Sequence, residues 1–557
     1  MKKTLITIFL SAAAIGALNA QTVEDALTLS ENNYEGTART IALGGAVTAL
    51  GSDLGSITMN PAGSAVAGYS QITISPGLSI CTTTAQGATP TENGWQATGN
   101  YNYFQSKMQS TRTRFMIPNL GFTFNIDTGR KSGLKDITLG FVMNGTNSWN
   151  EDVYAKGTND RTTFLGAMAS GAYGYTPDEL MSDDAFNNVP WSAAIGYYTG
   201  MINHIGNNEY IGATEILVGG NISMPGTINQ QFGMTKTGGK YDYIFNVGFN
   251  ISDFIYLGAN FGITSASYTY SQYLKEAAVN YEDFEIKLVD SEGNESVSYF
   301  NNMTYKSSYS LNSTGVYGKI GILVTPVKGL RLGAAIQTPT YNAIREKFNE
   351  SGQAQFKGPD GGNYSENSPD GENSYALTSP LRANFGVAYT FGRFGFVSAD
   401  YEVCNYGSMQ YKNGLYSDRE MLQAINDDIR AIYGPSHSVR VGAEIKPSSA
   451  LALRAGYGLT TAPEKKSVFG RVMNHNVSFG LGFSSKGSFF MDLAARYEFA
   501  NALPANALPV NTLLVNTYND YIFSQDASGE SYVDVKSPVL LVKRNPWKAV
   551  LTLGWRF

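Results

Sequence analysis

The chain ends in a segment whose side chains alternate between apolar and polar up to the last residue. Alternation with a period of two gives a β-strand one apolar face and one polar face. A frayed terminus in water has no physical reason to finish on Trp555, Arg556 and Phe557. A strand between lipid and a wet lumen does, with aromatic residues at the membrane interface. Residues 547–557 therefore predict the closing strand of a transmembrane β-barrel. Its apolar face carries Trp547, Ala549, Leu551, Leu553, Trp555 and Phe557.

The first residues have the pattern of an export signal. Lys2 and Lys3 form a basic start, residues 5–17 are apolar, and Ala20 precedes a plausible cleavage site. No later run of about 18 apolar residues exists, so we expect no membrane-spanning helix. We therefore expect a signal peptide over residues 1–20 and a mature chain that is integral to the bacterial outer membrane.

The composition excludes little but agrees with a barrel. The net charge of -6 offers no reason to expect nucleic acid as a partner. The mean hydropathy of -0.18 is unremarkable, as expected where only every second residue faces lipid. Cys81 and Cys404 lie far apart and imply no disulfide framework. We expect two isolated thiols, with a single bridge as the alternative, and no cofactor.

Tight turns alternate with long polar stretches along the chain. Gly, Pro, Ser and Asp supply the geometry of the tight turns. Short turns at one rim and long loops at the other are typical of outer-membrane barrels, and an even strand count of about fourteen fits the spacing. We predict an all-β, antiparallel transmembrane barrel. The turns lie at residues 127–135, 251–253, 326–329, 391–393, 447–449 and 484–487. The long stretches lie near residues 81–110, 156–227, 271–307, 348–374, 411–435 and 502–545, with a shorter one near 463–473.

Residues 21–67 do not have the pattern of a strand. Thr22 begins a helix-start signal. A stretch rich in glycine follows, which suits tight folding in a confined space. If the C-terminus lies at the periplasmic rim, the first strand near Gly68 starts there too. We therefore expect an N-terminal plug over residues 21–67 inside the lumen of a barrel formed by residues 68–557, because a barrel of this size is too wide for side chains alone to fill.

At this point the sequence resembles the FadL/TodX family of outer-membrane transporters. The resemblance includes Asn60, Pro61 and Ala62, placed directly before the first predicted strand, and the strand layout. It also includes the runs at residues 34–39, 43–45, 51–53, 242–250 and 256–258. The resemblance implies passive uptake of hydrophobic small molecules, either long-chain fatty acids or aromatic compounds. It implies capture at extracellular loops, binding in the lumen and lateral exit through the barrel wall.

The resemblance places the lateral exit where a strand kinks and its ladder breaks. Gly140 and Gly145 lie inside the third predicted strand, and glycine inside a strand marks bends or bulges. We take these two residues as candidates for the kink. Ordinary packing of small residues in the barrel wall is the alternative.

A fatty acid would need a partner for its carboxylate in the lumen. Arginine binds carboxylates through two parallel hydrogen bonds. The polar faces of the predicted strands carry four candidates, and pairing with nearby acidic residues of the wall is the alternative role. The candidates are Arg382, Arg440, Arg454 and Arg496.

Two long loops contain helix signals with apolar stripes. Thr176 and Glu179 form a capping box with Pro177 between them, and Ser417 and Glu420 form a second one. The stripes are either a capture surface for an acyl chain or packing against the rim. The candidate capture residues are Leu180, Met181, Phe186, Leu422, Ile425 and Ile429.

Other functions have weaker signals. A general or specific porin or an adhesin barrel remains the first alternative, and a barrel hydrolase the second. Hydrolysis usually needs a placed histidine, and His204, His437 and His475 lie in separate segments without an evident Ser or Asp partner. The acidic stretch at residues 360–372 lacks the alternating spacing of a calcium loop, so no metal site is expected.

The partners follow from the expected location. They are outer-membrane lipid and lipopolysaccharide, a hydrophobic small-molecule ligand, and the barrel-assembly machinery, to which Trp555 and Phe557 would act as the assembly signal in resembling proteins. We expect a monomer.

Overall fold

The computed structural model describes residues 22–91, 94–97, 103–218, 221–289, 295–413, 419–465, 471–485, 488–503, 511–525 and 531–557. The predicted signal peptide lies outside these residues, as do the first two residues of the predicted capping box at Ser417.

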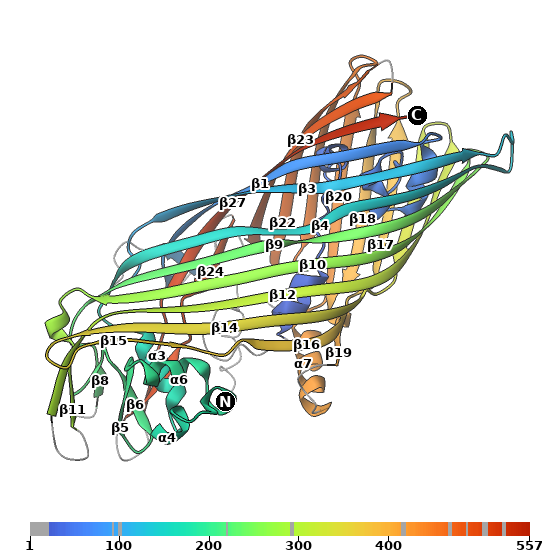
Figure 1. Ribbon diagram of the computed structural model, residues 1–557. Helices are drawn as coiled ribbons and strands as arrows, with labels where there is room; N and C mark the ends of the chain where they lie inside the picture. The colour runs from blue at the N-terminus through green and yellow to red at the C-terminus, as the bar shows by residue number, and fades with distance from the viewer. Residues whose placement is uncertain are drawn as a thin grey trace.

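Fourteen antiparallel strands close into a barrel, which confirms the predicted fold class (Figure 1). The first strand pairs with the last from Gln71 and Arg556 to Gly87 and Leu540. Two of the fourteen consist of two elements in line, β13 with β14 and β16 with β17. The wall consists of β1 (Gln71–Thr91), β3 (Met108–Asp127), β4 (Leu134–Asn159), β9 (Ile228–Ile251), β10 (Ile255–Ala278), β12 (Glu295–Val327), β13 (Leu330–Gln337), β14 (Tyr341–Lys357), β16 (Gly371–Thr378), β17 (Arg382–Thr390), β18 (Gly395–Asn405), β20 (Pro435–Ile445), β21 (Leu451–Thr461), β22 (Arg471–Ser484), β23 (Phe489–Leu503) and β27 (Val539–Arg556).

The strands are longer than the sequence predicted. The stretch near residues 81–110 was expected to be a loop, but β1 continues to Thr91 and β3 already begins at Met108. Likewise, β10 continues to Ala278 and β12 begins at Glu295. Beyond the membrane a strand meets water on its outer face, so the apolar face that reveals it in the sequence is missing.

The wall is uneven in height. The strands from β4 to β12 extend much further from the rim that holds the C-terminus than those from β17 to β21 (Figure 1). The short turns gather at the end that holds the C-terminus, and the long loops at the opposite end (Figure 1). This arrangement confirms the predicted sorting of turns and loops.

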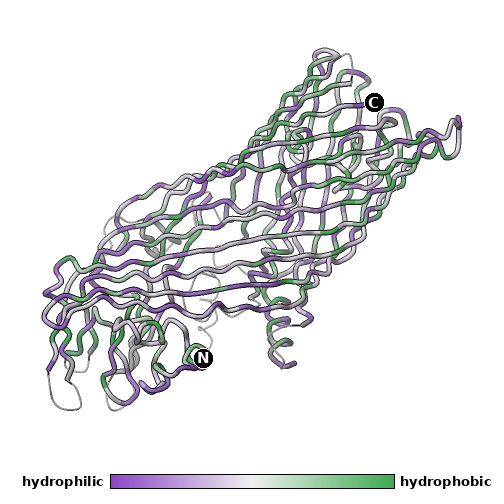
Figure 2. The backbone as a smooth tube through the Cα atoms, viewed as in Figure 1, coloured by the Kyte–Doolittle hydropathy of each residue, from purple (hydrophilic) through white to green (hydrophobic). Residues whose placement is uncertain are grey.

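The outer face of the barrel carries an apolar band with aromatic residues at its edges. Along β27, Trp547 is 49% exposed and Trp555 is 44% exposed, while Lys548 and Thr552 between them are buried. The eight residues from one tryptophan to the other span about 27 Å along a strand, which fits a band about 25 Å tall crossed at a tilt. Figure 2 shows the alternation of apolar and polar residues along the strands. Within the described residues, none of the helices has the length and apolarity to cross a membrane.

Residues 22–67, here called the N-terminal segment, fold inside the barrel (Figure 1, dark blue). The segment begins with the predicted helix, because Thr22 and Asp25 form a capping box. Glycines of the wall make room for it: a Cβ added at Gly456 would lie 2.1 Å from the amide nitrogen of Gly44. Its elements are α1 (Val23–Ser30), α2 (Ala38–Ala42), η2 (Leu54–Thr58) and η3 (Pro61–Val66).

The long loops carry the remaining elements. The predicted capping box of Thr176 and Glu179 is confirmed at the start of α4. The helices are α3 (Phe164–Ala172), α4 (Pro177–Leu180), α5 (Ala185–Asn188), α6 (Trp191–Tyr198), α7 (Arg419–Ile432), η4 (Tyr281–Asp283) and η5 (Tyr406–Ser408). The strands are β2 (Gly94–Ala97), β5 (Ile202–Gly206), β6 (Glu209–Gly212), β7 (Ile216–Val218), β8 (Asn221–Ser223), β11 (Glu285–Val289), β15 (Asn363–Asn367), β19 (Gln410–Asn413), β24 (Thr512–Asn516), β25 (Tyr521–Gln525) and β26 (Ser531–Val535).

One large cluster of buried apolar side chains fills the outer part of the lumen. It joins α1 to the loop helices and to the inward faces of the long strands. We call it the lumenal apolar cluster, and its members include Val23, Leu29, Phe164, Leu165, Phe232, Leu274, Tyr305 and Ile429.

Candidate functional site

The ladder between β3 and β4 is interrupted. These strands pair from Asp127 and Asp136 up to Asn119 and Asn144, and they meet again only at the bridge between Ser106 and Lys156 in the described part of the chain. On its other side β4 stays paired with β9 throughout, with a register shift between Gly145 and Asn147. We call this interruption the β3–β4 break.

The break begins at the height of the outer apolar band. Phe115, on β3 beyond Asn119, is still 63% exposed on the outer face. Further along β4, side chains cross from one strand to the other. The Asn150 amide donates to the carbonyl of Arg112 at 3.2 Å, and the Arg112 guanidinium pairs with Asp152 at 3.0 Å. Polar side-chain contacts therefore join the two strands here, where a backbone ladder joins them elsewhere.

The N-terminal segment supplies backbone partners to the inner edge of the break. The backbone amide of Asn33 donates to the carbonyl of Thr146 at 2.6 Å, and the backbone amide of Glu35 donates to the carbonyl of Gly145 at 2.9 Å. Buried backbone groups need such partners. Residues 33–35 thus occupy the place next to β4 that β3 has left.

Charged side chains hold residues 33–35 in place. The Glu35 carboxylate accepts hydrogen bonds from Lys548 at 2.7 Å and from Ser148 at 2.8 Å. The Asn33 amide side chain donates to Glu498 at 3.1 Å. Lys548 and Glu35 are both buried, so loss of either one would leave a charge without its partner in the lumen.

Two cations hold the end of α1 close to the break. The Lys240 ammonium donates to the carbonyls of Leu29 and Glu31, both at 2.7 Å, and Arg382 donates to that of Ser30. Lys240 lies on β9 opposite Asn147, at the register shift of β4. A cavity of about 10 Å³ lies between these groups, which is room for about one water molecule.

The predicted kink glycines differ in their surroundings. Gly145 lies at the register shift, and a Cβ added to it would lie 2.8 Å from a carboxylate oxygen of Glu35. Gly140 lies in a regular part of the ladder, between Thr123 on β3 and Asn246 on β9. Of the two, only Gly145 is at the break.

The four candidate arginines all point into the lumen and all meet carboxylates of the wall. Arg382 and Arg440 both bind Glu402 at 2.9 Å. Arg454 bridges Glu444 and Asp492, and Arg496 binds Glu498 at 2.8 Å. Only Arg382 also borders the small cavity. Three of the four are therefore engaged in a network within the wall, and Arg382 lies next to the end of α1.

The predicted motif of Asn60, Pro61 and Ala62 lies against the continuous part of the wall. The Asn60 amide donates to the carbonyls of Thr48 at 2.8 Å and Ile322 at 3.1 Å, and its oxygen accepts from the Ala62 amide. A Cβ added at Gly321 of β12 would lie 2.0 Å from the Asn60 oxygen. This part of the segment is wedged tightly onto β12.

The candidate capture residues lie among the loop helices. Leu180 and Ile429 are fully buried in the lumenal apolar cluster. Phe186, Leu422 and Ile425 pack against it while partly exposed. Met181 is exposed. Most of these side chains therefore cover the outer end of the lumen with apolar surface.

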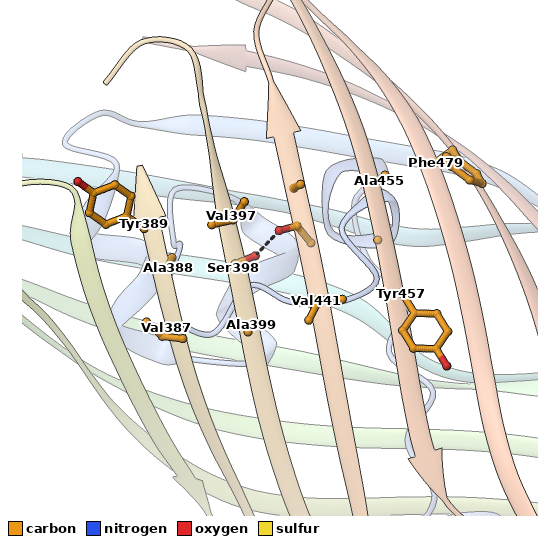
Figure 3. A pocket seen from close by; sticks show the side chains of 13 residues that line it. Val387, Ala388, Tyr389, Val397, Ser398, Ala399, Val441, Ala455, Tyr457 and Phe479 are labelled. Atoms are coloured by element: carbon orange, nitrogen blue, oxygen red, sulfur yellow. Dashed lines mark hydrogen bonds between the residues drawn. The ribbon is translucent and has the colours of Figure 1, made fainter. Parts of the chain in front are cut away.

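A large apolar hollow lies on the outer face of the wall, away from the break (Figure 3). It has a volume of about 630 Å³, and its lining includes Val397, Val441, Tyr457 and Phe479. The ladders of β18, β20 and β21 are continuous beneath it. The hollow therefore does not lead into the lumen.

The histidines and cysteines lie apart from the break. The Nδ1 atoms of His437 and His475 are hydrogen-bonded to the hydroxyls of Tyr401 and Tyr457 on the outer face, and His204 contacts Tyr210 in a loop. Cys81 and Cys404 are free thiols, which confirms the first of the two expectations for them.

Sequence reasoning missed Glu35, Lys240 and Lys548. Lys548 and Lys240 occupy inward positions of their strands, and that alternation is visible in the sequence. Glu35 lies in a segment without periodicity, so no local signal marks it.

No protein-family model matches the chain, and no curated protein matches it. Solved structures with a similar fold include a FadL homologue of Pseudomonas aeruginosa, with 13% identity over 94% of this chain and 98% of that chain and a TM-score of 0.48. The toluene transporter TodX of Pseudomonas putida has 12% identity over 94% and 99%, with a TM-score of 0.44. The toluene transporter TbuX of Ralstonia pickettii has 12% identity over 94% and 99%, with a TM-score of 0.42.

Proposed function

We propose that the chain is a passive outer-membrane transporter for hydrophobic small molecules, either long-chain fatty acid-like or aromatic. The ligand is captured among the apolar loop helices, enters the lumen and leaves sideways through the β3–β4 break. Residues 21–67 act as the plug that keeps the path closed between transport events.

The observation that carries this proposal is the position of the break. It opens where the outer face is apolar, since Phe115 and Leu120 on β3 are both exposed there. A backbone ladder is the main barrier between a lumen and the surrounding lipid, and at the β3–β4 break side chains replace it. A hydrophobic molecule that leaves at this height meets lipid and avoids water.

The lumenal apolar cluster and the cations next to it supply a path for an amphipathic ligand. Leu29 of α1 belongs to the cluster, while its carbonyl accepts from Lys240. An acyl chain fits the apolar side, and a carboxylate would bind Lys240 and Arg382 in place of the α1 carbonyls. Because residues 29–31 lead directly into residues 33–35, a ligand at these cations would loosen the segment that closes the break.

A cross-link tests the exit. A Cβ added at Gly145 would lie 3.3 Å from the Cβ of Glu35, so cysteines at positions 35 and 145 join the segment to β4 on oxidation. The background carries Cys81→Ser and Cys404→Ser. We expect cells with oxidised E35C/G145C to take up labelled fatty acid or toluene no faster than cells without the protein, and we expect reduction to restore uptake. The matched control is T82C/T111C, because these residues face each other across the intact β1–β3 ladder at 3.0 Å.

Equal uptake by the oxidised and the reduced E35C/G145C variant would refute lateral exit at the break. Unchanged uptake of every hydrophobic compound in deletion and complemented cells would refute transport itself. Conductance like that of an open porin would favour the first alternative, although the N-terminal segment occupies the lumen that an open pore needs.

A further inference from the structure

A polar hollow lies on the outer face of the long wall, above the apolar band. It has a volume of about 310 Å³, at the small end of the range for ligand pockets. Small residues on neighbouring strands form its floor, with Ser271 of β10 directly opposite Ser308 of β12. Tyr273, Lys306, Thr235 and Asn349 surround the floor.

The hollow has an aromatic side. A Cβ added to Gly233 would lie 2.2 Å from the Tyr273 ring, so the ring lies flat against the backbone of β9. Tyr154 of β4 is the neighbour of Gly233 on its other side. A flat ring offers an apolar face to the C–H groups of a sugar ring, while hydroxyl and amide groups nearby suit its hydroxyls.

The hollow also has a cationic side. Lys306 is exposed, faces Tyr273 across the ladder and forms no ion pair within the described residues. The Lys275 ammonium lies 5.6 Å from the centroid of the Tyr273 ring. The nearest acidic groups have partners of their own: Asp370 accepts from Asn349, Asp152 accepts from Thr235 and pairs with Arg112, and Glu372 binds Arg345 and Lys347.

The height of the hollow indicates what surrounds it. On β12 the outer face is apolar up to Val316, and the positions beyond it are Thr314, Asn312, Ser310 and Ser308. Eight residues along a strand are about 27 Å, which a tilt of about 40° reduces to roughly 20 Å above the band. At this distance a bacterial outer leaflet presents the head groups of its glycolipids.

We propose that this hollow binds the phosphorylated saccharide head group of an outer-leaflet glycolipid. One sugar ring stacks on Tyr273, Lys306 and Lys275 bind a phosphate, and Ser271, Ser308 and Asn349 contact hydroxyls. The proposal rests on the outer-membrane location in the proposed function and is independent of transport.

The test uses the purified full chain in detergent and a deacylated, phosphorylated core oligosaccharide of lipopolysaccharide as the probe, measured by titration calorimetry. K306Q should weaken binding about tenfold, because it removes one charge-assisted contact. Y273A should weaken it about fivefold, and Y273F should bind like the unchanged chain. K357Q is the matched control, because Lys357 is exposed at the end of β14, outside the hollow.

Equal affinity of K306Q and K357Q would overturn the proposal. So would equal binding of the dephosphorylated oligosaccharide, or binding of a sugar-free polyphosphate as tight as that of the oligosaccharide. Because uptake of hydrophobic compounds is measured separately, failure here leaves the transport proposal intact, and failure of transport leaves this site intact.

Discussion

The N-terminal segment meets the barrel wall in two different ways. At the β3–β4 break, residues 33–35 are held by hydrogen bonds and by the ion pair of Glu35 with Lys548. At β12, residues 60–62 are wedged against glycines, with Asn60 bonded to two carbonyls. A ligand can replace polar contacts with polar groups of its own, whereas nothing replaces close packing. We infer from this difference that a ligand can release one end of the segment and that the other end stays in place.

Removal of the ion pair should have the largest effect. E35A leaves Lys548 buried with only the more distant Glu498, at 3.4 Å, as a partner, which should cost about 3 kcal/mol. The amides of residues 33 and 35 should then exchange hydrogen for deuterium about 100 times faster. Amides of residues 60–63 should keep their protection, and E35M/K548M should restore the protection at 33–35. Faster exchange throughout the N-terminal segment would contradict the comparison.

Overpacking of the wedge should have the next largest effect. G321A forces a methyl group against the oxygen of Asn60, which should cost about 2 kcal/mol and lower the temperature at which the barrel loses its resistance to detergent on a gel. The control is G318A on the same strand, because its nearest atom lies 3.8 Å from the added Cβ. If both variants unfold at the same temperature, the wedge is not tight.

Removal of the Asn60 side chain should have a smaller effect. N60A loses the bonds to Thr48 and Ile322 but leaves the backbone contacts of the segment. We expect the free energy of unfolding to fall by about 1.5 kcal/mol. The measurement is again the temperature at which the barrel loses its resistance to detergent on a gel. Uptake should be less sensitive to N60A than to the E35C/G145C cross-link. If N60A reduces uptake more, the contact at β12 is the one that controls transport.

A change of pH should have the smallest effect on stability, and it acts through a carboxyl group that lies outside both contacts. Burial raises the pKa of Glu215 to about 8, in a loop beneath α3, with Glu276 nearby. Above the ordinary pKa of a glutamate, the unfolded chain releases a proton that the folded loop keeps. The stability of the folded loop therefore falls as the pH rises towards 8. Between pH 6 and 7 the loss should be about 1 kcal/mol.

The measurement is hydrogen exchange at α3, corrected for the intrinsic pH dependence of the exchange rate. E215Q should remove the slope. E215Q should leave hydrogen exchange at residues 33–35 unchanged, because the ion pair of Glu35 with Lys548 does not involve the Glu215 carboxyl group. An unchanged slope in E215Q would assign the pH dependence to another group.

The sequence predicted the wall better than the site. Alternation over residues 547–557 and the tight turns predicted a barrel with the observed strand count. The candidate arginines have partners that include carbonyls of the N-terminal segment, such as those of Ser30 and Tyr34, which no pattern in the sequence indicated. Of the two kink candidates, only the structure separates Gly145 from Gly140, because the register shift depends on what β3 and residues 33–35 do beside it.

By itself the sequence determined which faces of the strands meet lipid and where the chain turns, because both depend on neighbouring residues and on a period of two. The tertiary structure alone decided where the wall is interrupted and what closes it. A break in a ladder is a missing contact between distant segments, and Glu35, Lys240 and Lys548 come together there from three separate parts of the chain. Long-range pairing of this kind leaves no local pattern, since each partner alone is an ordinary residue of its strand or loop.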